Sequence, residues 1–143
     1  MRLNQLATRL APALALLGSA AAQTIHVDAN LTSGANDGSS WANAFQGTDG
    51  LQAALAASSP GDEVYVADGL YRTNNSGSRA LSFRLLNDVE IYGGFAGGEP
   101  SPDERPAFGT APSILTADLN GNDGPNFAGN AENSYHVIRT QGT

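Results

Sequence analysis

Alternating apolar and polar positions identify the clearest strand of the chain at residues 63–67. Val64 and Val66 share one face of this segment, and β-branched residues at every second position are typical of a half-buried strand. Asp68-Gly69 follows, and its glycine accepts a positive φ without a Cβ clash. A second short strand is predicted at 70–73, so the chain turns a corner there instead of folding back.

The same alternation returns 25 residues further along the chain, where Val89 and Ile91 take the positions of Val64 and Val66. Other short apolar segments bounded by Gly, Asn, Asp and Pro also predict strands. These segments lie at residues 25–29, 80–86, 114–117 and 135–140. The chain is therefore expected to be β-rich throughout.

One segment has the period of a helix. Leu51, Ala54 and Leu55 fall at positions i, i+3 and i+4, which gathers them on one helical face. Pro60-Gly61 follows the segment and is a typical stop signal. The sequence predicts one helix, at about residues 49–58.

The order of the strands predicts a coil. Three short strands separated by corners are followed by three more, as in a parallel coil with roughly 20–30 residues per turn. In such a coil Val64 lies over Val89, Leu70 lies near Ile114, and Phe83 lies near the last strand. The predicted fold class is all-β, with about two turns of coil and one helix.

The first 22 residues have the pattern of a secretory signal peptide. Arg2 and Arg9 form a basic region, Leu10–Leu17 are apolar, and Ala20-Ala21-Ala22 provide the small residues of a cleavage site. The apolar stretch is shorter than the about 20 residues of a membrane-spanning helix. We expect a secreted or cell-surface protein whose mature chain, residues 23–143, has no membrane span.

Charge and cysteine usage narrow the classes of partner. Removing Arg2 and Arg9 leaves five arginines against fourteen carboxylates, a formal balance of −9. Such a surface repels nucleic acid, which we exclude as a partner. The chain has no cysteine, so packing must supply its stiffness. An acidic surface attracts Ca²⁺, although scattered carboxylates also serve solubility.

One loop carries a cation-binding pattern. Asp118, Asn120, Asn122 and Asp123 place oxygen-bearing side chains at close spacing, similar to the start of an EF-hand loop. The match is partial, because Asp123 stands where the sixth position requires glycine and Gly129 stands where the twelfth requires glutamate. We predict a calcium site at these four residues, and an ion-free turn stays open as the alternative.

Catalytic chemistry has little support in the sequence. Glu90, Tyr92 and Arg84 are expected to point outward, where they line a sugar groove or form a solvated face. His26 and His136 lie far apart and lack metal-ligand spacing. No nucleophile, base and orienting residue occur together, so no catalytic residue is predicted.

A family resemblance rests on several segments in order. They are IHVDA, NDGSSWANAF, LQAALAA, PGDEVYVADGLY, SFRLLNDVEIYGGF, SILTADLNGND and NSYHVIRT. With them the mature chain resembles the N-terminal region of bacterial secreted right-handed parallel β-helix proteins of the pectin-lyase-like superfamily. The resemblance implies a right-handed coil of about two rungs, with an N-terminal helix that caps its open end.

Two functions are compatible with this resemblance. The first is the noncatalytic N-terminal part of a secreted or cell-surface β-helix protein that acts as a scaffold, adhesin or glycan-binding module. The alternative is the N-terminal part of a pectate-lyase-like polysaccharide-degrading enzyme, a lyase or glycoside hydrolase, with its catalytic rungs beyond residue 143. In either case extracellular polysaccharides or cell-surface glycans are the expected partners. We also expect a longer solenoid, because a strand immediately precedes residues 141–143.

Overall fold

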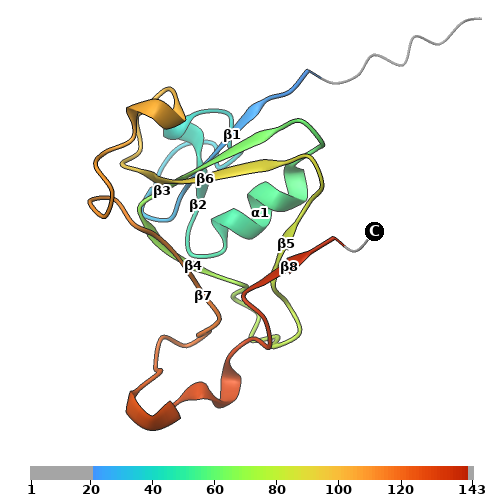
Figure 1. The fold of residues 1–143 in the computed structure, drawn as a ribbon, viewed down its shortest axis with the longest axis vertical. Coiled ribbons are helices and arrows are strands. Elements are labelled where there is room, and N and C mark those ends of the chain that lie inside the picture. The colour runs from blue at the N-terminus through green and yellow to red at the C-terminus, as the bar shows by residue number, and fades with distance from the viewer. Residues whose placement is uncertain (1–20, 142–143) are drawn as a thin grey trace, which may run out of the picture.

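The computed structural model describes residues 21–141 (Figure 1), so nearly all of the predicted signal peptide lies outside the described part. The strands are β1 (Thr24–Asp28), β2 (Phe45–Gln46), β3 (Glu63–Ala67), β4 (Gly69–Arg72), β5 (Phe83–Leu85), β6 (Glu90–Phe95), β7 (Ser113–Thr116) and β8 (Ile138–Thr140). The helices are α1 (Gly50–Ala57) and four short 3₁₀ turns, η1 (Trp41–Asn43), η2 (Pro102–Glu104), η3 (Pro125–Phe127) and η4 (Asn130–Glu132). The prediction of a β-rich chain with one α-helix is confirmed for this part of the sequence.

The strands form three parallel sheets. One has the order β2-β1-β3-β6, and the others are the pairs β4-β7 and β5-β8. Each of β6, β7 and β8 therefore lies beside the strand three places before it. The predicted neighbours Leu70 and Ile114 are register partners, and Phe83 pairs with Ile138 of the last strand.

One predicted register is wrong by two residues. Val64 pairs with Ile91 instead of Val89. The reason lies at Asp88, which has a φ of 58° and whose carbonyl accepts the amide of Gly61. The corner thus ends at Asp88, and β6 begins only at Glu90. Val89 belongs to the entrance of the strand and packs against the core while partly buried.

Helix α1 covers the interior on the side of β1 and β2. It packs against β1, β2 and β5, and Figure 1 shows it between the four-stranded sheet and the β5-β8 pair. Leu51, Ala54 and Leu55 are buried, as their spacing predicts. The helix ends where Ser58 donates its backbone N–H and its hydroxyl to the carbonyl of Ala54.

A buried carboxylate holds the helix exit. Asp62 is 3% exposed and accepts the backbone N–H groups of Ser59, at 2.8 Å, and Gln23, at 3.0 Å. The N–H of Ser59 lowers the pKa of Asp62 below its ordinary value against the opposing effect of burial. Because folding lowers this pKa, the ionised carboxylate stabilises the fold at pH values above the ordinary pKa of aspartate. The stabilisation is lost as the pH falls through the lowered pKa of Asp62.

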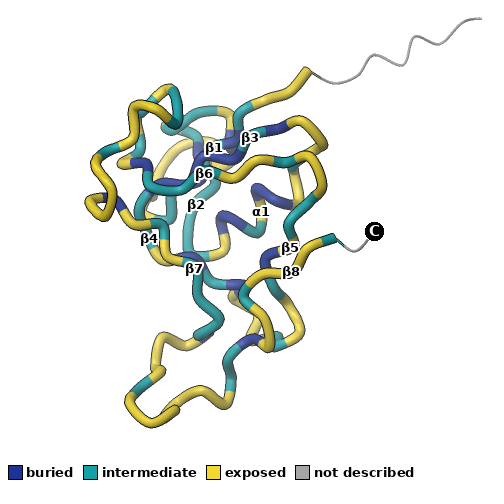
Figure 2. The backbone as a smooth tube through the Cα atoms, in the orientation of Figure 1, coloured by how far each residue is buried: buried dark blue, intermediate teal, exposed yellow. Residues whose placement is uncertain are grey.

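The core lies between the three sheets and α1 (Figure 2). Its largest fully buried side chains are those of Tyr71, Phe83, Leu51, Val27, Val64 and Val66. The strands β6, β7 and β8 are less covered than β3, β4 and β5, the strands that they pair with. Ile138 is 47% exposed although its partner Phe83 is fully buried, and Ile91 is 36% exposed above a fully buried Val64.

The helices of residues 21–141 are all too short or too polar to cross a lipid bilayer.

Truncating Phe83 tests the core. Phe83→Ala removes a ring with no exposed surface, and we expect it to lower the free energy of unfolding by about 3–5 kcal/mol. Phe108→Ala is the matched control, because Phe108 is fully exposed and its loss should change stability by less than about 0.5 kcal/mol. Urea unfolding followed by the fluorescence of Trp41 measures both. Equal effects in the two variants would contradict the assigned core.

Candidate functional site

An aromatic ladder covers the outer face of the four-stranded sheet. His26, Tyr65 and Tyr92 occupy matching positions of β1, β3 and β6. The ring of Tyr65 lies 5.8 Å from that of His26 and 5.9 Å from that of Tyr92, measured between centroids. Trp41 and Phe95 extend the ladder, with 4.7 Å between Trp41 and His26 and 4.6 Å between Phe95 and Tyr65. Trp41 therefore packs on the outer face of the sheet.

The position of His26 in the ladder lowers the pKa of its imidazole. Burial lowers the pKa of His26, and the hydrogen bond from its ring to the carbonyl of Gly38 offsets only part of that effect. His136, by contrast, is exposed and lies just before β8. The structure does not bring the two histidines together, in agreement with the sequence.

Two carboxylates in register accompany the tyrosines. Glu63 pairs with Glu90, and each accepts the hydroxyl of the tyrosine two residues further along its strand, Tyr65 or Tyr92. The hydrogen bond to Glu63 and burial raise the pKa of Tyr65 to about 12. Both hydroxyls therefore stay protonated at neutral pH and serve as donors to the carboxylates.

The three side chains expected to line a sugar groove or form a solvated face do not share one sheet. Glu90 and Tyr92 lie on β6, whereas Arg84 lies on β5, which belongs to a different sheet. The cation beside Tyr92 is Arg105, whose guanidinium carbon is 5.7 Å from the centre of the Tyr92 ring. Arg105 comes from the long segment between β6 and β7.

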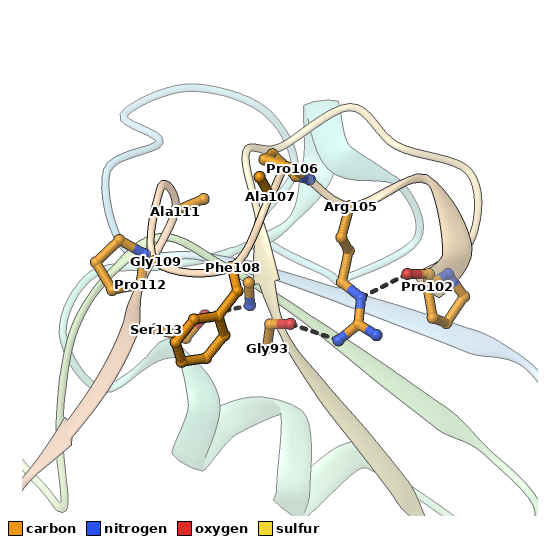
Figure 3. A pocket seen from close by; sticks show the side chains of 11 residues that line it. Gly93, Pro102, Arg105, Pro106, Ala107, Phe108, Gly109, Ala111, Pro112 and Ser113 are labelled. Carbon is orange, nitrogen blue, oxygen red and sulfur yellow. Dashed lines mark hydrogen bonds between the residues drawn. The ribbon is translucent and has the colours of Figure 1, made fainter.

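That segment encloses a pocket of about 550 Å³ (Figure 3). Glycine, proline and alanine make up most of its lining, which consists of Gly93, Gly94, Pro102, Arg105, Pro106, Ala107, Phe108, Gly109, Ala111, Pro112 and Ser113. Figure 3 shows Phe108 and Arg105 on opposite sides of Gly93. The pocket is apolar, with one cationic group and one exposed ring.

Main-chain carbonyls hold the guanidinium of Arg105. Its Nη1 donates to the carbonyl of Gly93 at 2.9 Å, and its Nε donates to that of Pro102. Gly94 donates its N–H to the hydroxyl of Ser113, which bonds in turn to carbonyls of β3. These bonds fix the floor of the pocket, so its shape depends on the corner between β6 and β7.

The predicted calcium loop lies at the opposite end of β7. The carboxylate of Asp118 accepts the backbone N–H groups of Gly121, Asn122 and Asp123. Partial desolvation acts against these bonds, but together the N–H groups lower the pKa of Asp118 below its ordinary value. Asp118 thus closes the turn and stays ionised.

The loop also gathers acidic side chains. Carboxylate oxygens of Asp118, Asp123 and Glu132 lie within 4.8 Å of one another. Oxygen donors at such spacing suit Ca²⁺, which takes six to eight oxygen ligands. The structure thus unites Asp118 with Asp123 and adds Glu132. No contact of the side chains of Asn120 and Asn122 supports their predicted role as ligands.

The sequence pattern did not point to Glu132, because an EF-hand loop of twelve residues that starts at Asp118 ends at Gly129. The short turns η3 and η4 fold the chain back, and Gly129, with a φ of 84°, passes close to the carbonyl of Asn122. Oε1 of Glu132 and Oδ1 of Asn133 are buried and lack a hydrogen-bond partner among the described residues. A glutamate just before the last strand was the available signal, but its meaning depends on the fold of the loop.

A guanidinium lies close to the same loop. The terminal nitrogen of Arg72 is near Gly121, 2.8 Å from where a Cβ would stand. This positive charge weakens the field of the three carboxylates, so the arrangement also suits a turn without an ion. The calcium site stays a prediction.

Comparison with known proteins gives no match to a family model, a curated protein or a solved structure.

Added Ca²⁺ tests the loop. If Asp118, Asp123 and Glu132 bind the ion, Ca²⁺ should raise the melting temperature, because a ligand of the folded state stabilises that state by mass action. Glu132→Gln should abolish the rise while leaving the hydrogen bonds of Asp118 intact. Asp118→Ala should abolish it too, but should also lower the melting temperature without Ca²⁺, since three N–H groups lose their acceptor.

The matched control is Glu104→Gln, which neutralises an exposed glutamate in η2, a different loop. Scanning calorimetry with Ca²⁺ or with excess chelator measures the shift. An equal rise in the parent chain and in Glu132→Gln would mean that the loop is a turn without an ion site.

Proposed function

We propose that this chain forms the first coils of a right-handed parallel β-helix and acts as a noncatalytic part of a secreted or cell-surface protein. The observation that carries the proposal is the register of the strands. β3, β4 and β5 are followed in the same order by β6, β7 and β8, and each pair is parallel. This repeated order supports a coil, in which the chain meets itself one turn later on three sides.

Two features support the finer description. Parallel crossover connections are right-handed in nearly all known proteins, which favours the right-handed form. Helix α1 precedes β3 and packs against β1, β2 and β5, so it suits the role of a cap. An exposed coil end would offer unpaired strand edges, and a helix is a common way to cover them.

The chemistry of the outer face supports a noncatalytic role. Glu63 and Glu90 are engaged by tyrosine hydroxyls, and Arg105 is held by main-chain carbonyls beside Tyr92. A lyase requires a basic group free to remove a proton near a bound cation. Arg105 instead serves as a fixed donor. It lies at the opposite end of β7 from the acidic loop, which carries Asp118, Asp123 and Glu132.

Extracellular glycans are the partners that we propose. The pocket beside β6 carries an exposed ring, Phe108, and a charged donor, Arg105. Aromatic faces pack on apolar groups of a ligand while guanidinium groups bind its oxygens. Export through the predicted signal peptide would place this surface outside the cell.

Engineered disulfides test the coil. Leu70→Cys with Ile114→Cys joins register partners on β4 and β7, and adjacent strands bring their Cα atoms within the range a disulfide spans. Because the chain has no cysteine of its own, only this bond can form. We expect spontaneous crosslinking, seen as a shift on non-reducing gels. The control, Leu70→Cys with Thr116→Cys, is two residues out of register and should crosslink poorly; the reverse order would refute the coil.

An elimination assay tests the noncatalytic role. We expect residues 23–143 to bind immobilised polysaccharide without forming unsaturated product from pectate, with or without Ca²⁺, because the guanidinium beside the acidic loop at residues 118–132, that of Arg72, has its Nε buried. Ultraviolet absorbance of the product measures the reaction. Product formed by the parent chain and lost in Asp118→Ala would favour the pectate-lyase-like alternative.

A further inference from the structure

We infer that the outer face of β5 and β8 binds small organic esters of sulfate or phosphate through two arginines in register. Arg84 of β5 is the register partner of Arg139 of β8. Phe83, the neighbour of Arg84, faces the interior, so the alternation of β5 directs Arg84 outward. Its register partner Arg139 lies on the same face of the sheet and is exposed as well. Parallel strands lie about 4.8 Å apart, so the two guanidinium groups leave the sheet side by side.

Two like charges in this arrangement favour a shared anion. Like charges directly opposite one another destabilise a sheet. Both arginines are exposed, and they are two of only five in the mature chain, which carries fourteen carboxylates. An oxyanion held between them would remove the repulsion and accept hydrogen bonds from both.

The other arginines near the surface are engaged differently. Arg79 donates from Nε to the carbonyl of Asn133 and lies over the ring of Tyr135. Arg105 donates to two carbonyls beside the pocket of Figure 3. These two side chains stabilise loops, and Arg79, which has no proposed ligand, is a useful control for the pair on β5 and β8.

A groove next to the arginine pair defines the rest of the ligand. Its volume is about 970 Å³, and it lies between α1 and the strands β5 and β8. Ala56, Leu81 and Leu86 contribute apolar surface, and Leu81 is 44% exposed. The groove therefore suits a compact apolar body attached to an anionic head.

The head group follows from the geometry of two donors. A carboxylate has two oxygens in one plane and matches a single guanidinium. Sulfate and phosphate monoesters share three terminal oxygens in a tetrahedral arrangement, so one head group can bind two guanidinium groups at once. This inference does not depend on the proposed glycan partners or on the acidic loop.

Titration calorimetry of the full chain at constant ionic strength tests the site. The probes are 4-nitrophenyl sulfate, 4-nitrophenyl phosphate and the neutral 4-nitrobenzyl alcohol. We expect at least one ester to bind and the alcohol not to bind. Arg84→Gln and Arg139→Gln should each weaken ester binding about tenfold or more, the loss expected for a charge-assisted hydrogen bond. Arg79→Gln should leave it unchanged.

A second variant separates the head group from the apolar body. Leu81→Ser should weaken binding of the ester and leave binding of inorganic sulfate or phosphate unaltered. The ester that binds better identifies the head group. Absence of binding by both esters, equal binding of the alcohol, or an affinity that neither arginine variant changes would overturn the inference. Circular dichroism of each variant confirms that the coil is intact.

Discussion

The stacking of each inward side chain on the one a turn away is the interaction on which this structure depends. A strand of three to six residues buries too little surface to be stable by itself, and in a coil its partners come only from the preceding and following turns. Val64 is fully buried because Ile25, on β1, and Ile91, on β6, flank it in register. Ile91, with a neighbour on one side only, keeps about a third of its surface exposed.

The same register brings outward residues of one kind together. Tyr65 meets Tyr92 and Glu63 meets Glu90 on the four-stranded sheet. The paired glutamates are tolerable because a tyrosine hydroxyl donates to each of them. Among residues 21–141 no such hydrogen bond compensates the in-register arginines of β5 and β8, so the parallel register itself creates an electrostatic difference between the two sheets.

Local patterns were sufficient to predict much of the fold. The apolar spacing of α1, the alternation of β3 and the pairing of Leu70 with Ile114 all follow from periods of 3.6 and 2 residues. Strand β2 was missed because two residues show no alternation. The slipped register of β6 arose at Asp88, where a positive φ in a residue other than glycine gave no signal in the sequence.

The site was less predictable because it depends on how long loops close. Arg105 reaches Tyr92 only through the segment that follows η2, and Glu132 reaches Asp118 only because η3 and η4 reverse the chain. Asp118 itself is ambiguous, since its carboxylate would close the turn whether or not an ion is bound. Glu132 makes no such hydrogen bond, and one of its oxygens is buried without a partner. Glu132 therefore distinguishes an ion site from an ion-free turn, although it lies outside the EF-hand-like pattern at residues 118–123.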